Sequence, residues 1–248
     1  MNILVCVSQV PDTASKIAVD ASGKKINPAG VKFIVNPYDE YALEEGLRQK
    51  AASGGTVTAL TVGGDTAKEA LRTALAMGVD KAILVKDDVR EDSFSVAENI
   101  AAVAKEINPD LIILGRQSID FDSFQVASMV GEILGLPSIS MVSKLAINGT
   151  NVTADRDIEG GKETVETTLP CVISAQKGLN EPRYPKLPDI MKAKSKPIEE
   201  RPSASSTTRV EVLAMELPQS KRAGKVLGGS DGDIAELVRL LHEEAKVV

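Results

Sequence analysis

Two hydrophobic patterns alternate four times along the first 140 residues of the chain. Short β-branched apolar runs are followed by alanine- and leucine-rich stretches in which the apolar residues recur with helical spacing. The predicted strands are Ile3–Val7, Thr56–Val62, Ala82–Val85 and Leu111–Leu114, and the predicted helices are 39–52, Thr66–Met77, Ser93–Ile107 and Gln125–Leu134. Strands that are apolar on both faces need helices on both sides. The pattern therefore predicts an α/β fold with a doubly wound, mostly parallel sheet.

After residue 138 the pattern changes to shorter strands. The predicted strands here are Ser138–Ser143, Lys144–Ile147, Asn151–Ala154, Lys162–Thr168 and Val172–Ser174. Asn148-Gly149 favours a hairpin turn between two of them. We expect antiparallel strands added to the sheet.

From Glu181 to about residue 229 the chain loses periodicity and is rich in proline. We therefore predict an α/β domain over residues 1–193 and an extended C-terminal arm over 194–248. The arm ends in a short amphipathic helix that begins after Ser230, with Asp233 three residues further on. This helix could pack on a partner or fold back on its own domain, and the pattern alone favours neither.

Composition excludes several classes of function. The 248 residues carry a net charge of −6 and few aromatic side chains, which is a poor basis for binding nucleic acid. One histidine and two distant cysteines, Cys6 and Cys171, indicate no metal site, no disulfide framework and no histidine-based catalysis. The first residues lack a basic segment and a long apolar run, so we expect a cytoplasmic protein without membrane insertion. No catalytic side chain is predicted.

Polar loops follow the predicted strands at the edge where parallel sheets bind ligands. The loop Gly63–Thr66 would let a phosphate approach a helix start, although a tight turn is the commoner explanation. The loop 115–125 carries Arg116 and several serine, aspartate and glutamine side chains after the most apolar strand. These groups could bind the phosphate and ribose of a nucleotide. The alternative is a solvated surface loop, and the position after a buried strand favours the nucleotide.

Two further segments contain proline next to aromatic residues. Asn36-Pro37-Tyr38-Asp39 has the pattern of a helix start, at which Asp39 can accept the first free amides. The segment 180–191 carries three prolines that stiffen the backbone around Tyr184 and Leu187. Such a segment suits partner recognition, or it packs on the flank of its own domain.

In combination, these segments resemble the β subunits of electron-transfer flavoproteins over nearly the whole chain. The resemblance rests on ILVCVSQVPDT at 3–13, NPYDEYALEEGLRQK at 36–50, ALRTALAMGVDKAILV at 70–85, LIILGRQSIDFDSFQVA at 111–127, RDIEGGKETVETTLPCVIS at 156–174 and NEPRYPKLPDIMKAKSKPIE at 180–199. It implies a Rossmann-like domain related to the universal stress proteins. It also implies a heterodimer with an α subunit that holds most of the contacts to a redox FAD, so that this chain is an electron carrier rather than an enzyme.

The resemblance further implies that the β subunit binds a structural AMP. By similarity, the binding residues are Cys6, Asn36, Pro37, Tyr38, Asp39, Val62, Gly63, Gly115, Arg116, Gln117, Ser118, Ile119, Asp120, Asp122, Ser123, Phe124, Gln125 and Val126. The segment 180–191 resembles the recognition loop of the family, with Leu187 as the docking leucine and Tyr184 and Pro188 beside it. The implied partners are acyl-CoA dehydrogenase-type flavoproteins and a quinone oxidoreductase, which places the chain in fatty acid β-oxidation.

Some positions depart from the pattern of the family. Residue 8 is serine where lysine is usual, and Phe121 and Phe124 replace smaller residues. Val126 stands where AMP-binding members often have threonine, and valine is common in an electron-bifurcating branch that holds a second FAD and oxidises NADH. The two phenylalanines leave less room for a second flavin, which favours AMP. A universal-stress-like nucleotide module is a third alternative, although it would need neither the arm nor the segment 180–191.

Overall fold

The structure is a computed structural model that describes residues 1–87, 92–204, 208–218 and 224–247. The chain divides into two units, Met1–Met215 and Glu216–Val248, which are treated separately below. Parts of the predicted arm, at 205–207, 219–223 and 248, lie outside the described residues.

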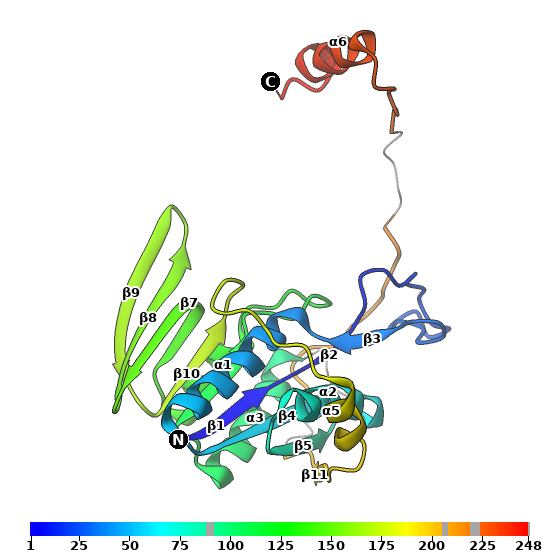
Figure 1. The fold of residues 1–248 in the computed structure, drawn as a ribbon. Helices are drawn as coiled ribbons and strands as arrows, with labels where there is room; N and C mark the ends of the chain where they lie inside the picture. The colour runs from blue at the N-terminus through cyan, green and yellow to red at the C-terminus, as the bar shows by residue number, and fades with distance from the viewer. Residues whose placement is uncertain (88–91, 205–207, 219–223, 248) are drawn as a thin grey trace. The chain divides into compact units, whose positions relative to one another are not determined.

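The first unit is built on one large sheet (Figure 1). Among the described residues, nine strands follow the order β11-β5-β4-β1-β6-β10-β7-β8-β9. Pairing is parallel from β11 to β7 and antiparallel from β7 to β9. The strands are β1 (Asn2–Cys6), β4 (Thr56–Gly63), β5 (Lys81–Lys86), β6 (Leu111–Gly115), β7 (Ser138–Asn148), β8 (Asn151–Ile158), β9 (Gly161–Thr168), β10 (Cys171–Ala175) and β11 (Glu199–Pro202). This architecture confirms the predicted fold class.

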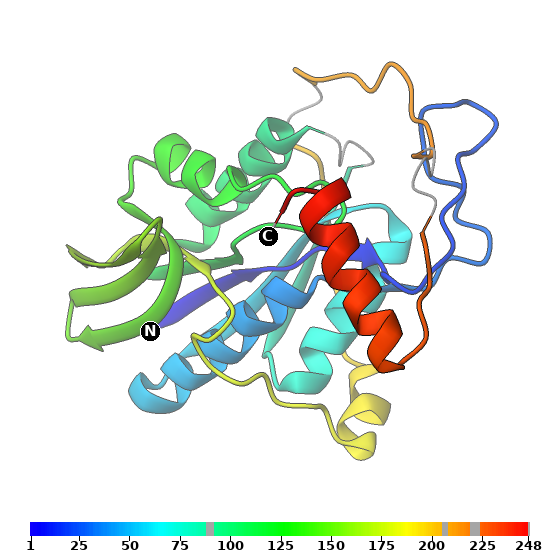
Figure 2. The ribbon, with the colours of Figure 1, turned by 90° about the horizontal axis from the view of Figure 1, so that it is seen from above.

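Helices cover both faces of the parallel strands (Figure 2). The helices α1 (Pro37–Ser53) and α2 (Lys68–Met77) lie on one face, with the short 3-10 helix η1 (Asp65–Ala67) before α2. On the other face lie α3 (Ser93–Ile107) and α4 (Val126–Leu134). Helix α1 packs closely on the sheet because Gly46 has no side chain, and a Cβ there would lie 2.7 Å from Val5 Cγ2. Each face therefore has its own apolar core, with the parallel strands between them.

A small antiparallel pair stands apart from the large sheet. It consists of β2 (Gln9–Pro11) and β3 (Phe33–Val35), which frame the loop between them.

The expectation for the strands after residue 138 needs two corrections. The two strands predicted over 138–147 are one strand, β7, with an irregularity between Val142 and Lys144. The strand predicted at Val172–Ser174 is β10, which pairs in parallel with both β6 and β7 inside the sheet. Its side chains are buried, as a strand covered on both faces requires. The predicted hairpin at Asn148-Gly149 is confirmed between β7 and β8.

Two elements lie in the stretch that the sequence pattern left without secondary structure. Helix α5 (Leu187–Ala193) packs beside α2, and β11 pairs with the edge strand β5. Both elements are too short to show a hydrophobic period.

The second unit contains α6 (Asp231–Arg239), which continues as a π-helical turn, η2 (Leu240–Glu244). The predicted helix start is confirmed, because Ser230 and Asp233 form a reciprocal capping box. Ile234, Leu237 and Val238 are about half-exposed along one face of this helix.

Within the described residues, no helix is long and apolar enough to cross a membrane. The described part of the chain also contains no group of three or more histidine, cysteine, aspartate or glutamate side chains that could hold a metal ion.

Candidate functional site

A pocket opens at the carboxyl ends of three neighbouring parallel strands. Its floor comes from Cys6 at the end of β1, Leu60 and Val62 of β4, and Leu114 and Gly115 at the end of β6. The chain continues to one side of β1 through β4 and β5, and to the other side through β6. The pocket therefore lies at the switch point of the doubly wound sheet, where such folds bind ligands.

One wall of the pocket is apolar. Val96 and Ile100 of α3, together with Val126 and Ala127 of α4, face the strand residues Leu60, Val62 and Leu114. Burial raises the pKa of the Cys6 thiol, so this group is neutral and behaves as part of the apolar floor. Such a wall suits a flat, weakly polar group such as a nucleobase.

Another part of the lining is polar and includes two helix starts. Ser93 is the first residue of α3, and Ser123 lies just before α4. Their hydroxyl groups are hydrogen-bonded to each other at 3.3 Å. Ser8, Ser118 and Gln117 add further polar groups. Hydroxyls near helix amides form a favourable environment for an anion such as phosphate.

Asp39 ties the floor of the pocket together. Its carboxylate accepts hydrogen bonds from the Ser8 amide at 2.7 Å, the Ser8 hydroxyl at 2.7 Å and the Gly115 amide at 3.0 Å. A Cβ at position 115 would lie 2.3 Å from Asp39 Oδ1, so only glycine fits there. Burial raises the pKa of Asp39 to about 6, although these hydrogen bonds oppose the shift. Asp39 therefore joins the exits of β1 and β6 and does not cap α1, which corrects the expectation for this residue.

Asn36 holds the polar loop in place through two side-chain hydrogen bonds. Its side-chain amide donates to the Gln117 carbonyl at 2.8 Å, and its side-chain oxygen accepts from the Ile119 amide at 3.2 Å. Asn36 is fully buried, so it acts on the pocket through the backbone of residues 117–119.

Arg116 lies between two aromatic rings at the pocket. Its guanidinium carbon is 5.0 Å from the centre of the Tyr38 ring and 4.7 Å from that of Phe124. It also donates to Gln117 Oε1 at 2.7 Å and to Gln176 Oε1 at 3.1 Å. The rings and these two glutamines hold the arginine in place, so its charge stays beside the pocket.

The structure sorts the predicted cofactor residues into two groups. Those that line the pocket are Cys6, Asp39, Val62, Gly115, Arg116, Gln117, Ser118, Ser123 and Val126. Those that lie in the same segments without lining it are Asn36, Pro37, Tyr38, Gly63, Ile119, Asp120, Asp122, Phe124 and Gln125.

Some lining residues were not anticipated from the sequence. They are Val7, Ser8, Leu60, Ser93, Val96, Ile100, Leu114 and Ala127. Phe121, which the sequence placed in the nucleotide loop, also lines the pocket. Helical spacing relates Ser93, Val96 and Ile100, but only the packing of α3 shows that this face borders the pocket.

The segment 180–191 forms a second candidate surface, and its first anchor is on α1. Arg183 donates to both carboxylate oxygens of the buried Glu44, from Nε at 2.7 Å and from Nη2 at 2.9 Å. Asn180 donates to Glu45 Oε2 at 3.0 Å and to the Tyr41 carbonyl at 3.0 Å. The start of the segment is thus fixed to the helix that also begins at the pocket.

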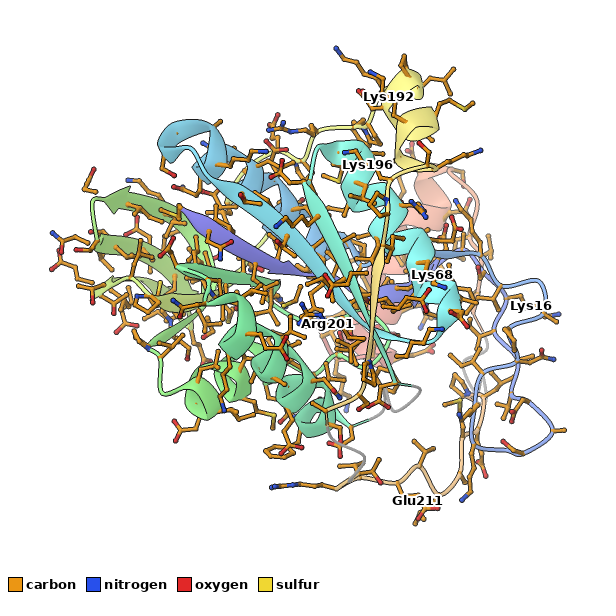
Figure 3. The ribbon with its side chains drawn as sticks, turned by 90° about the horizontal axis from the view of Figure 1, so that it is seen from below. Lys16, Lys68, Lys192, Lys196, Arg201 and Glu211 are labelled. Atoms are coloured by element: carbon orange, nitrogen blue, oxygen red, sulfur yellow. The ribbon has the colours of Figure 1, made fainter. Side chains whose placement is uncertain are left out.

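The other anchor is on α2. Arg72 donates to the carbonyls of Ala193, at 2.7 Å, and of Lys196. Lys196 in turn donates to the carbonyls of Leu75 and Val79, at 3.4 and 3.3 Å. Helices α2 and α5 therefore satisfy each other's C-terminal carbonyls. Figure 3 shows Lys192 on α5 and Lys196 just beyond it.

Between these anchors the predicted docking residues are exposed. Tyr184 is 93% and Leu187 73% exposed, and Pro188 is exposed beside them. Ile190 and Met191 extend this apolar surface along α5. An apolar surface on a segment fixed at both ends suits docking to another protein, because little conformational freedom is lost on binding.

Comparison with known proteins identifies the family. A sequence model described as "Electron transfer flavoprotein domain" matches residues 24–206. The chain is 45% identical to the electron transfer flavoprotein subunit beta of Bacillus subtilis and 41% identical to that of Bradyrhizobium diazoefficiens, each over the full length of both proteins. It is 38% identical, again over both full lengths, to the mitochondrial subunit beta of Arabidopsis thaliana. The chain belongs to the family of electron transfer flavoprotein β subunits.

Proposed function

We propose that this chain is the β subunit of a heterodimeric electron carrier. Together with an α subunit it takes electrons from flavin dehydrogenases, such as acyl-CoA dehydrogenases, and delivers them to a quinone oxidoreductase. Its relatives are named as subunits beta, which supports an α partner. It is itself no enzyme, and its role belongs to fatty acid β-oxidation in the cytoplasm.

The pocket holds a structural AMP. The observation that carries this proposal is the division of the pocket into an apolar wall and a polar wall with two helix starts. The base would lie against Leu60, Val96 and Ile100, and the phosphate near Ser93 and Ser123. AMP has no redox chemistry of its own, so its contribution is to stabilise the fold at the switch point.

The redox chemistry comes from an FAD held mainly by the α subunit and shared at the interface. That flavin accepts and releases the electrons, while residues of this chain bind and orient the partners. The segment 180–191 docks the dehydrogenase through Leu187, Tyr184 and Pro188. The half-exposed face of α6 packs on the α subunit, which its lack of buried residues supports.

A second candidate is the bifurcating function with a second FAD that oxidises NADH. Val126 favours it, because this residue lines the pocket without the hydroxyl of a threonine. Phe121 favours AMP, since this bulky residue also lines the pocket and would leave less room for a second flavin. A universal-stress-like module is disfavoured by the anchored, exposed segment 180–191.

Titration of the nucleotide-free chain with AMP tests the pocket. We expect wild-type protein to bind AMP with release of heat, and Val96→Trp, which fills the apolar wall, to lose this binding. Ile158→Trp, a substitution at an exposed apolar residue of β8 outside the pocket, is the control and should bind like wild type. Equal binding by Val96→Trp, or no binding by wild type, would contradict the proposal.

A further inference from the structure

Described residues in β11 and after it contact α3 at three places along its length. Arg201 is paired with Glu106 near the C-terminal end of the helix, with 2.6 Å between Nη1 and Oε2. At mid-helix, the Ala204 amide donates to Asn99 Oδ1 at 2.7 Å, and the Ser203 hydroxyl oxygen lies 3.1 Å from the same atom. At the first turn, Arg209 meets Asp92 and Phe94. The residues that make these contacts, Arg201, Ser203, Ala204 and Arg209, are what we call the strap.

The strap follows one stripe of α3. The three residues that the strap contacts are seven positions apart: Asp92, Asn99 and Glu106. Seven residues make about two helical turns, so these side chains lie on the same side of the helix. Asn99 is almost completely buried, and its amide also donates to Asp87 Oδ2 at 3.0 Å, to which Ser203 donates at 2.6 Å. The contacts at mid-helix are therefore part of a buried polar network, in which each lost partner is costly.

Asp92 joins the strap to the start of α3. Its side chain is the N-cap and accepts from the Phe94 amide at 2.9 Å and from the Ser95 hydroxyl at 3.2 Å. It also accepts from the backbone amide of Arg209, whose guanidinium carbon lies 3.5 Å from the centre of the Phe94 ring. Asp92 is 1% exposed, so its charge depends on these donors. The first turn of α3 is thus held from outside by the strap.

The same turns of α3 form a wall of the nucleotide pocket. Ser93, Val96 and Ile100 line it, on the face adjacent to the Asp92–Asn99 stripe. Ser93 follows Asp92 directly and is hydrogen-bonded to Ser123, which also lines the pocket. A shift of the first turn of α3 would therefore change the pocket.

We propose that the strap positions α3 as the pocket wall, so that retention of the nucleotide depends on the strap and the strap depends on the nucleotide. This inference rests on the proposed AMP site. Arg209 and Ser203 are positioning residues that act through Asp92 and through the Asp87–Asn99 pair, and neither is among the residues that line the pocket. Because binding linkage is reciprocal, AMP must tighten the strap by the same factor by which the strap tightens AMP.

A matched control lies on β11 itself. Glu200 pairs with Lys68 at 2.8 Å and Lys86 at 2.6 Å, and both lysines also pair with Asp65. Figure 3 shows Lys68 and Arg201 on either side of β11. The Glu200 contacts fasten β11 toward α2, so their loss removes a contact from the same strand without touching α3.

The test uses the chain in complex with its α subunit, loaded with AMP. Three proteins are compared: wild type, the double variant Arg209→Pro/Ser203→Ala, and Glu200→Gln. Proline at position 209 has no backbone N–H and so cannot donate to Asp92. Two quantities are measured, namely hydrogen exchange of the amides of Ser93–Ile100 and the rate of AMP release into a chase of unlabelled AMP. We expect the double variant to exchange faster in this turn and to release AMP about tenfold faster, which is the effect of losing one charged-group hydrogen bond. Glu200→Gln should match wild type in both.

The two measurements separate the possible failures. Unchanged exchange in Ser93–Ile100 would overturn the strap. Faster hydrogen exchange in the double variant with an unchanged rate of AMP release would overturn the coupling between the strap and the nucleotide. The coupling would also be overturned if AMP failed to slow hydrogen exchange at the amides of Ala204 and Arg209 in the wild-type complex. A wild-type complex that retains no AMP would contradict the proposed ligand, whereas exchange in α3 would still confirm or refute the strap.

Discussion

The guanidinium of Arg183 donates two hydrogen bonds to the buried carboxylate of Glu44, and the backbone amide of Arg183 donates a third at 3.1 Å. Arg183 follows the loop after β10, whereas Glu44 lies in the middle of α1. This pair explains why the segment 180–191 can expose Tyr184 and Leu187 without losing its shape. The apolar docking surface depends on a polar anchor beneath it.

Arg183→Lys should weaken docking. Lysine keeps the charge but cannot make two parallel bonds to one carboxylate, so the segment loses its fixed orientation. We expect the KM of a flavin dehydrogenase for the heterodimer to rise about fivefold, equivalent to about 1 kcal/mol, with little change in kcat. Steady-state electron transfer from an acyl-CoA dehydrogenase measures both constants.

Arg48→Lys is the matched control for this prediction. Arg48 lies on the same helix, and its hydrogen bonds to the described residues are long, at 3.4 Å to Glu45 and 3.5 Å to the Leu179 carbonyl. Its substitution should leave KM unchanged. An equal rise in KM for both variants would show that Arg183 has no special role in docking.

Leu187→Ala should slow electron acceptance without releasing nucleotide. The side chain is exposed in the first turn of α5 and does not line the pocket, so its loss removes an anchor and leaves the pocket intact. We expect kcat/KM to fall by about tenfold to a hundredfold, as for the loss of about 1.4–2.8 kcal/mol of docking energy. Ile158→Ala, at another exposed apolar residue, serves as the comparison. Unchanged acceptance kinetics for Leu187→Ala would contradict the docking role.

Asp39 should give the stability of the chain a pH dependence of unusual sign for a carboxylate. Its pKa is raised from 3.8 to about 6 in the folded chain because of burial. The folded state therefore binds more protons than the unfolded state between these two values, so stability falls as pH rises through this window and is constant above it. The shift is worth about 3 kcal/mol at most.

Asp39→Asn isolates this contribution. Comparing denaturant unfolding of wild type and the variant at several pH values cancels the titration of other groups. We expect wild type to lose stability relative to the variant from about pH 4 to pH 6, and the difference to stay constant above pH 7. A difference that does not change with pH would mean that Asp39 titrates normally.

Ser230→Ala should loosen the C-terminal helix. The substitution removes the hydroxyl that accepts from the Asp233 amide and breaks the capping box, at a cost of about 1 kcal/mol. Helix α6 has no buried residue that could compensate. We expect faster hydrogen exchange across Asp231–Arg239 in the free chain, and rescue by Ser230→Thr. Identical exchange in Ser230→Ala would show that the cap is not limiting.

The alternating pattern of the first 140 residues was sufficient to predict the parallel sheet, because each predicted strand there is followed by a predicted helix, which is the crossover that parallel strands require. The parallel placement of β10 was not predictable, since a five-residue buried strand carries no information about its neighbours. Helix α5 and strand β11 were missed for a similar reason. Their contacts are with Arg72, Leu75 and Lys86, which lie far away in sequence.

The pocket, too, was only partly predictable from the sequence. Loop residues such as Gly115 and Arg116 were predictable from their place after an apolar strand. Ser93, Val96 and Ile100 were not, because their helix shows no polar cluster and becomes a wall only through its packing. Asn36 was identified by resemblance, but its buried hydrogen bonds to the backbone of residues 117–119 depend on the tertiary fold.

The nucleotide content of the intact heterodimer tests the central claim most directly. The chain is co-expressed with its α subunit, the purified complex is denatured, and the released nucleotides are separated and quantified. The account predicts one AMP and one FAD per heterodimer. Two FAD molecules without AMP would contradict it and indicate the bifurcating function.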